Sequence, residues 1–157
     1  MQWIYRFFIV TLLCVNTSVL AEPVLHCTSL ALKSENKEIV LPGPDEPRAT
    51  KVYVFKNFTT QSIWLDHPVL HPSASAGWSS YLRVGHAAAL WVNRKNFNIN
   101  CAVIKPGKLE YLNCAKAVSV CEPKEMNMKI TRKGTFWLVE DKPMDALLKG
   151  LARLKEQ

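Results

Sequence analysis

Residues 101–114, CAVIKPGKLEYLNC, decide the fold that this chain predicts. Two runs that favour β-strands flank Pro106-Gly107, a dipeptide typical of a type II turn. Proline presets the φ angle of the first central residue, and glycine accepts the positive φ that follows. The stretch therefore predicts a β-hairpin with a cysteine at each end.

The register of this hairpin leaves the contact between its two cysteines open. If a longer loop pairs Lys105 with Glu110, Cys101 lies directly opposite Cys114. With a tighter turn Cys101 faces Leu112 instead, and the two cysteines are only diagonal neighbours.

Short segments that favour strands recur along the rest of the chain, separated by turn residues such as PGPDEP at 42–47. Short strands at spacings of about 8–12 residues are typical of a sandwich or barrel. We predict an all-β, immunoglobulin-like β-sandwich of about seven or eight short strands. The segments that favour strands are 24–32, 38–41, 50–58, 62–66, 77–84, 86–92, 96–104, 109–120, 126–131 and 134–140.

The start of the chain predicts export. Residues 1–21 have the three parts of a secretory signal peptide: Arg6, an apolar run over 7–15, and the small-residue cleavage site Val-Leu-Ala at 19–21. A membrane-spanning helix needs about 20 apolar residues, and this run is shorter. We expect residues 22–157 to form one periplasmic or secreted domain without a transmembrane segment.

Cysteine usage fits an oxidising compartment. Cys14 lies in the predicted leader, which leaves Cys27, Cys101, Cys114 and Cys121. Four cysteines allow three pairings. We favour Cys101–Cys114 together with Cys27–Cys121, and two disulfides without a free thiol. Each bridge is expected to contribute about 2–4 kcal/mol by restricting the unfolded chain.

One amphipathic helix is predicted at the C-terminus, over residues 143–155. Its polar positions include Lys149, and Asp141 could cap its start. The helix either covers the sandwich, which the pattern favours, or binds a partner. The apolar residues that recur at helical spacing are Met144, Leu147, Leu148, Leu151 and Leu154.

Charge restricts the class of partner. The formal net charge is +7, and the predicted leader contributes only Arg6 to it. Such an excess is found in ordinary basic exported proteins and also attracts anionic surfaces such as phospholipid, lipopolysaccharide or peptidoglycan. The basic residues are spread along the chain without a recognition motif, so no nucleic-acid partner is expected.

The sequence predicts no enzyme and no cofactor, because it lacks a catalytic constellation such as the G-x-S-x-G nucleophile elbow. Metal binding is an alternative, since His67 and His71 are four residues apart and could hold copper or zinc. The cysteines are too far apart in sequence for a typical zinc site. A cell-wall enzyme, or an inhibitor of a cell-wall hydrolase, is a second alternative.

An aromatic and basic cluster offers a binding surface, because aromatic and arginine side chains are the usual interface anchors. Strand alternation places Tyr81 and Arg83 on the side opposite Trp78, so the whole cluster cannot share one face. We expect Tyr81 and Arg83 to be exposed and Trp78 to be in the core. The residues predicted to bind a partner are Tyr81, Arg83, Trp91, Arg94 and Lys95.

The tripeptide Asn57-Phe58-Thr59 has the sequence of an N-glycosylation site. It matters only in a host that glycosylates exported proteins.

Five segments resemble the enhanced-entry B proteins of intracellular gammaproteobacteria. The resemblance covers roughly residues 50–151, and it implies a small exported virulence protein linked to host-cell entry or intracellular survival. It offers no catalytic residues to transfer. We expect a non-enzymatic interaction protein of the bacterial envelope or secreted fraction that binds a protein or an anionic envelope surface. The segments are SIWLDHP (62–68), SASAGWSSYL (73–82), WVNRK (91–95), CAVIKPGKLEYLNC (101–114) and FWLVEDKP (136–143).

Overall fold

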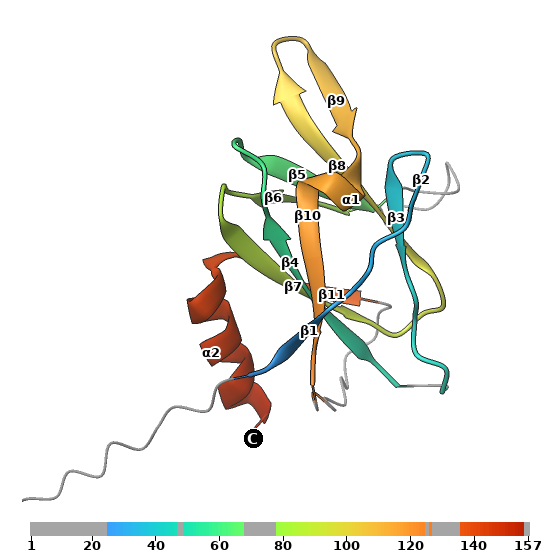
Figure 1. Ribbon diagram of the computed structural model, residues 1–157, viewed down its shortest axis with the longest axis vertical. Coiled ribbons are helices and arrows are strands. Elements are labelled where there is room, and N and C mark those ends of the chain that lie inside the picture. Colours follow the sequence, from blue (N-terminus) through green and yellow to red (C-terminus); the bar gives the residue numbers. More distant parts are fainter. Residues whose placement is uncertain (1–24, 47–48, 68–77, 125, 127–135, 156–157) are drawn as a thin grey trace, which may run out of the picture.

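The computed structural model describes residues 25–46, 49–67, 78–124, 126 and 136–155. The predicted signal peptide lies outside this range, as do His71 and the side chain of Trp78. Within the described residues the chain forms eleven strands and two helices (Figure 1). The predicted all-β sandwich with one C-terminal helix and two disulfides is confirmed. The structure has more strands than expected because several of them contain only two to four residues.

The first sheet is antiparallel and has five strands. Its central strands are β4 and β7, which pair along most of their length. In spatial order the strands are β1 (Cys27–Ser29), β10 (Val118–Pro123), β4 (Lys51–Asn57), β7 (His86–Val92) and β11 (Phe136–Pro143).

The second sheet is also antiparallel. The hairpin at its edge takes the tight register, with Lys105 opposite Lys108 and Cys101 opposite Leu112. Gly107 in the turn has a φ of 76°, which glycine adopts without steric cost. The strands are β2 (Ser34–Glu35), β3 (Glu38–Leu41), β8 (Phe97–Lys105), β5 (Ile63–His67) and β6 (Trp78–Leu82) in that order, with β9 (Lys108–Leu112) paired to β8.

The core lies between the two sheets. Tyr53 and Phe55 of the first sheet pack there with Ile63, Leu65 and Phe97 of the second, and all five are fully buried. These residues alternate along their strands with residues that face outward, as a pleated strand requires. Burial also raises the pKa of the Tyr53 hydroxyl, which donates a hydrogen bond to the Pro42 carbonyl.

Helix α2 (Met144–Lys155) covers the outer face of the first sheet. Leu147 and Leu151 are buried there against a second apolar cluster that includes Val54, Ala89 and Trp91. Strand β7 is therefore buried on both faces, which explains why its sequence HAAALWV does not alternate. The helix packs on the domain through Met144, Leu147, Leu148 and Leu151 of its predicted stripe, whereas Leu154 is exposed. In the part of the chain that the structure describes, neither helix is long and apolar enough to cross a membrane.

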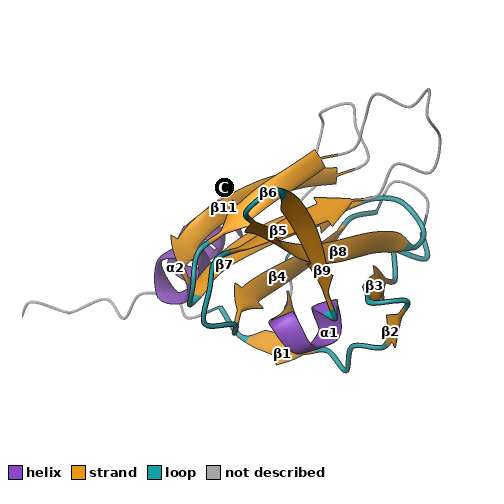
Figure 2. Ribbon diagram, turned by 90° about the horizontal axis from the view of Figure 1, so that it is seen from above, coloured by secondary structure: helices purple, strands orange, loops and turns teal. Residues whose placement is uncertain are grey.

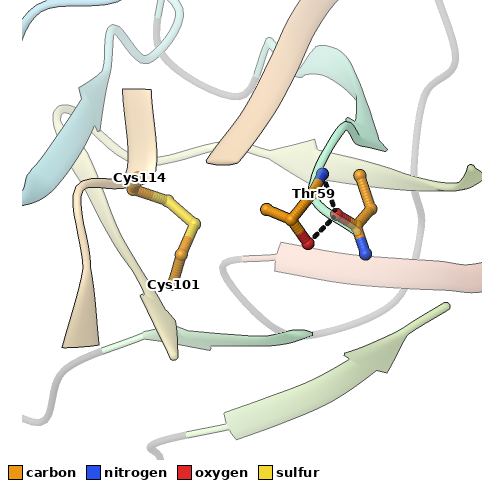
Figure 3. The surroundings of a disulfide bond; sticks show 4 residues. Thr59, Cys101 and Cys114 are labelled. Atoms are coloured by element: carbon orange, nitrogen blue, oxygen red, sulfur yellow. Dashed lines mark hydrogen bonds between the residues drawn. A yellow bond between two sulfur atoms is a disulfide. The ribbon is translucent and has the colours of Figure 1, made fainter. Parts of the chain in front are cut away.

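Both disulfides follow the favoured pairing. Cys27–Cys121 joins the edge strand β1 to β10 across 94 positions of sequence. Cys101–Cys114 joins β8 to the first residue of a short helix, α1 (Cys114–Ala117), whose presence interrupts the strand expected over 109–120. Figure 3 shows this bridge, with Thr59 nearby. The cysteines are not opposite each other in the ladder, but the turn into α1 brings their Cα atoms to 5.0 Å.

Candidate functional site

The structure does not place the predicted binding residues on one surface. Tyr81 is exposed on the outer face of the second sheet, while Trp91 is only 4% exposed and lies under α2 on the first sheet. Assigning Trp91 to an exposed patch was therefore wrong, because the docked helix buries the face that carries it. Lys95 is exposed in the loop that precedes β8, at the end of that strand distant from the hairpin turn.

Arg83, in the turn between β6 and β7, belongs to a charged cluster with Asp141 and His86, which we call the clamp. Its Nε donates to the carboxylate of Asp141 at 2.7 Å, and its backbone N–H donates to the same group at 3.1 Å. The Nδ1 atom of His86 lies 3.1 Å from Oδ1 of the same carboxylate. Asp141 sits at a bulge in β11 with a φ of 53°, so it is not the predicted helix cap. The clamp ties the β6–β7 turn to β11.

The imidazole of His86 with its carboxylate partner resembles two members of a catalytic triad. A triad also needs a nucleophile within hydrogen-bond reach of the second ring nitrogen. Among the described residues, no serine hydroxyl or cysteine thiol is hydrogen-bonded to His86. The geometry in this part of the chain is that of a structural clamp.

Arg94 lies beside His67 rather than on an open surface. The Nδ1 atom of His67 is 2.7 Å from the Asn98 carbonyl and therefore donates to it, because a carbonyl only accepts. The Nε2 atom then accepts from the Arg94 guanidinium at 3.4 Å. The imidazole also stacks on Phe97, with ring centroids 4.1 Å apart. A metal ion at Nε2 would have to displace the positive charge of Arg94.

The other proposed metal ligand, His71, lies outside the described residues. Within the described ranges, no group of three or more His, Cys, Asp or Glu side chains is placed to hold a metal ion.

The outer face of the second sheet carries a row of aromatic side chains in direct cross-strand register. Tyr81 of β6 lies opposite Trp64 of β5, Trp64 lies opposite Ala102 of β8, and Ala102 lies opposite Tyr111 of β9. The small Ala102 side chain is fully buried between its neighbours, whereas both tyrosines are exposed. The row crosses the adjacent strands β6, β5, β8 and β9. Figure 2 shows these strands from above.

An aliphatic pair continues this surface toward the hairpin turn. Ile104 and Leu109 lie opposite each other, next to the pair formed by Ala102 and Tyr111, and they are 67% and 48% exposed. We call the outer face of the second sheet formed by Trp64, Tyr81, Tyr111, Ile104 and Leu109 the apolar face. Exposed apolar surfaces that are contiguous mark interaction sites more often than isolated apolar side chains do.

Of this group, only Tyr81 was predicted from the sequence to lie at a binding surface. Each member lies at an outward position of its own strand, and strand alternation in the sequence can indicate such positions. Their combination depends on the strand order β6–β5–β8–β9, in which β5 and β8 are distant in sequence.

Charge differs between the two ends of the apolar face. At the hairpin turn, Lys105 contacts Glu110 at 2.5 Å, and the hydrogen bond from Lys105, followed by the positive charges of Lys105, Lys108 and Lys37, lowers the pKa of that carboxyl. At the opposite end, partial burial raises the pKa of Asp66, and the negative charge of Glu38 raises it further. Lys105, Lys108 and Glu110 alternate with Ile104 and Leu109, so the charges at the turn lie on the other side of the hairpin, whereas Asp66 shares the outward side with Trp64.

The Asn57 side chain is buried and its amide nitrogen and oxygen are both hydrogen-bonded, whereas a glycosylation site needs an accessible amide. Its Nδ2 donates to the carbonyls of Gln61 and Leu82 at 2.9 and 3.1 Å. Its Oδ1 accepts from the backbone N–H and the hydroxyl of Thr59, both at 2.8 Å (Figure 3). The residue shapes the β4–β5 turn, and its amide is not accessible to a glycosylating enzyme.

A pocket of about 310 Å³ opens at the start of β4, between the loop that precedes this strand and the end of β10. Val52 and Met126 line its apolar part, and Asp45, Lys51 and Glu122 line its polar part. The mixed charges do not define one class of ligand.

Comparisons with protein families, with curated proteins and with solved structures found no match to this chain.

Proposed function

We propose that this protein is a non-enzymatic binding module of the bacterial envelope or secreted fraction, and that it binds through the apolar face. The observation that supports this proposal is that four exposed residues, Tyr81, Tyr111, Ile104 and Leu109, and the half-buried Trp64 lie on one side of the sandwich.

The two outer faces of the sandwich differ in a way that favours binding. The first sheet is covered by α2, whose leucines bury that face. The second sheet presents its outward tyrosines and aliphatic residues to solvent in the described part of the chain. Tyrosine and tryptophan are among the commonest anchors of protein interfaces. Leaving them exposed has a solvation cost that a bound partner removes.

The disulfides support an exported location. Cys27–Cys121 and Cys101–Cys114 require an oxidising compartment, because cytosolic thiols are kept reduced. The charge excess favours an anionic surface of the envelope as the place of action. The link to host-cell entry that the resemblance implies stays a prediction.

Co-sedimentation of the purified protein with isolated bacterial envelopes tests this proposal. The variant Tyr81→Ala/Tyr111→Ala removes two exposed aromatic rings and should lose most of the sedimenting fraction. Phe58→Ala is the matched control, since Phe58 is an exposed ring in the β4–β5 turn. Equal sedimentation of the double variant and the wild type would show that another surface binds.

A further inference from the structure

We propose that the β8–β9 hairpin docks on the surface of an anionic phospholipid membrane. In this arrangement Ile104, Leu109 and Tyr111 enter the headgroup region, and the neighbouring lysines contact the lipid phosphates. The inference rests on the proposed function, because it names the partner of the apolar face.

The hairpin has the shape that such docking requires. It extends beyond the body of the sandwich, at the end away from the C-terminus (Figure 1). Ile104 is 67% exposed and is the most exposed large apolar residue in the described part of the chain, and Leu109 lies opposite it. Peripheral membrane proteins bury this kind of apolar surface at the boundary of headgroups and acyl chains.

The charges around the apolar pair have the sign that an anionic surface attracts. Lys105 and Lys108 flank the turn at the tip of the hairpin, on the side opposite to Ile104 and Leu109, and Lys37 reaches β9 by donating to the Tyr111 carbonyl at 3.2 Å. Glu110 is the one acidic residue of the hairpin, and its carboxylate is paired with Lys105. Lysines can rest their apolar stems on the surface while the ammonium groups reach the phosphates.

The acidic end of the apolar face does not oppose this orientation. Asp66 lies opposite Asn100, four positions along β8 from Ile104. At about 3.3 Å per residue the separation is about 13 Å. This exceeds the Debye length of about 8 Å at physiological ionic strength, so repulsion at the level of Ile104 and Leu109 is largely screened. Tyr111 lies opposite Ala102, only about 7 Å along β8 from the level of Asp66, so the attraction is weaker at that residue.

The aromatic geometry favours a membrane over a glycan. The rings of Trp64 and Tyr81 are tilted by 58° and do not form the coplanar platform on which a sugar ring stacks. Next to the turn, the hairpin presents the exposed aliphatic pair Ile104 and Leu109 together with the ammonium groups of Lys105 and Lys108. Tryptophan and tyrosine are enriched where a membrane meets water, because one end of each side chain is apolar and the other polar.

Vesicle co-sedimentation of the full mature chain tests the inference. Vesicles of phosphatidylcholine are compared with vesicles in which about one third of the lipid is phosphatidylglycerol, at about 0.15 M salt. We expect binding to the anionic vesicles, weaker binding at higher salt, and little binding to phosphatidylcholine alone.

Two variants separate the apolar and charged contributions. Ile104→Ser/Leu109→Ser should weaken binding to anionic vesicles about tenfold or more, because it removes the inserted apolar surface. Its control is Phe58→Ser/Val84→Ser, which changes two exposed apolar residues outside the hairpin. Lys105→Gln/Lys108→Gln should weaken binding by a similar factor. Its control is Lys95→Gln/Lys124→Gln, which removes the same charge from exposed sites elsewhere. All variants should melt within a few degrees of the wild type.

Three results would overturn the inference. They are absence of binding to anionic vesicles, equal effects of the hairpin variants and their controls, and self-association that Ile104→Ser/Leu109→Ser abolishes. If envelopes still bind the protein through Tyr81 and Tyr111 while pure lipid vesicles do not, the proposed function stands and the lipid partner is wrong. If neither envelopes nor vesicles bind it, both proposals fail.

Discussion

Trp64 and Tyr81 lie directly opposite each other on β5 and β6, with their ring centroids 5.3 Å apart and their planes tilted by 58°. Tilted aromatic pairs contribute about 0.5–1.5 kcal/mol beyond the area that they bury. The pair holds the indole in place at the centre of the apolar face.

Replacing Tyr81 by alanine should therefore lower the free energy of unfolding by about 1 kcal/mol and change the emission of Trp64. Tyr81→Phe keeps the ring and should leave stability within about 0.5 kcal/mol of the wild type. Urea denaturation measures both variants. A loss above about 3 kcal/mol for Tyr81→Ala would place this ring in the core and contradict the exposed face.

Trp91 should behave in the opposite way, because it is buried between the first sheet and α2. We expect Trp91→Ala to cost about 3–5 kcal/mol, as large-to-small core changes do. The Nε1 atom of this indole is buried without a hydrogen-bond partner among the described residues. Trp91→Phe, which removes that polar atom, should consequently cost only about 1–2 kcal/mol. Equal costs for the two variants would show that the indole N–H is satisfied.

The clamp at Asp141 gives a prediction with two matched substitutions. Asp141→Asn tolerates the positive φ but loses the ion pair with Arg83, so it should cost about 1 kcal/mol. Asp141→Ala loses the hydrogen bonds as well and puts a residue less tolerant of positive φ at the bulge, so about 2–3 kcal/mol is expected. Chemical denaturation measures the order of stability of the two variants. An Asp141→Asn variant less stable than Asp141→Ala would contradict the prediction.

Asn57 should remain unmodified even when the protein is exported by a glycosylating host, because its amide is buried and hydrogen-bonded. Mass spectrometry of the exported protein checks this. Asn57→Ala should lower the free energy of unfolding by about 1–3 kcal/mol, since it removes the donor to the carbonyls of Gln61 in the β4–β5 turn and of Leu82 in β6. A glycan on Asn57 in the folded protein would show that this turn opens.

The two disulfides should contribute unequally to stability. Loop-closure entropy predicts about 4.7 kcal/mol for Cys27–Cys121 and about 2.9 kcal/mol for Cys101–Cys114, because the first closes a much longer loop. Paired cysteine-to-alanine variants, compared by denaturation, test the order. The buried Cys101–Cys114 bridge is also the harder one for a reductant to reach in the native protein. A larger loss for Cys101→Ala/Cys114→Ala would mean that core packing outweighs loop closure.

Features that depend on residues close in sequence were predictable. Pro106-Gly107 predicted a hairpin because these two residues have strong φ preferences of their own. The leucine spacing predicted α2 almost to its observed bounds, since helical periodicity repeats within a few residues. The favoured cysteine pairing is confirmed, but the sequence left the register open, and the structure has the tight register in which Cys101 faces Leu112.

The functional surface required the tertiary structure. Alternation can show that Tyr81 and Trp91 lie outward on their strands, but it does not show that α2 covers one outer face and leaves the other exposed. Tyr111 joins Trp64 and Tyr81 only because β8 pairs with both β5 and β9. Strand order and helix docking are decided by packing between segments far apart in sequence. Local preferences therefore specified the elements of this protein, whereas long-range packing determined which side chains remained available to bind.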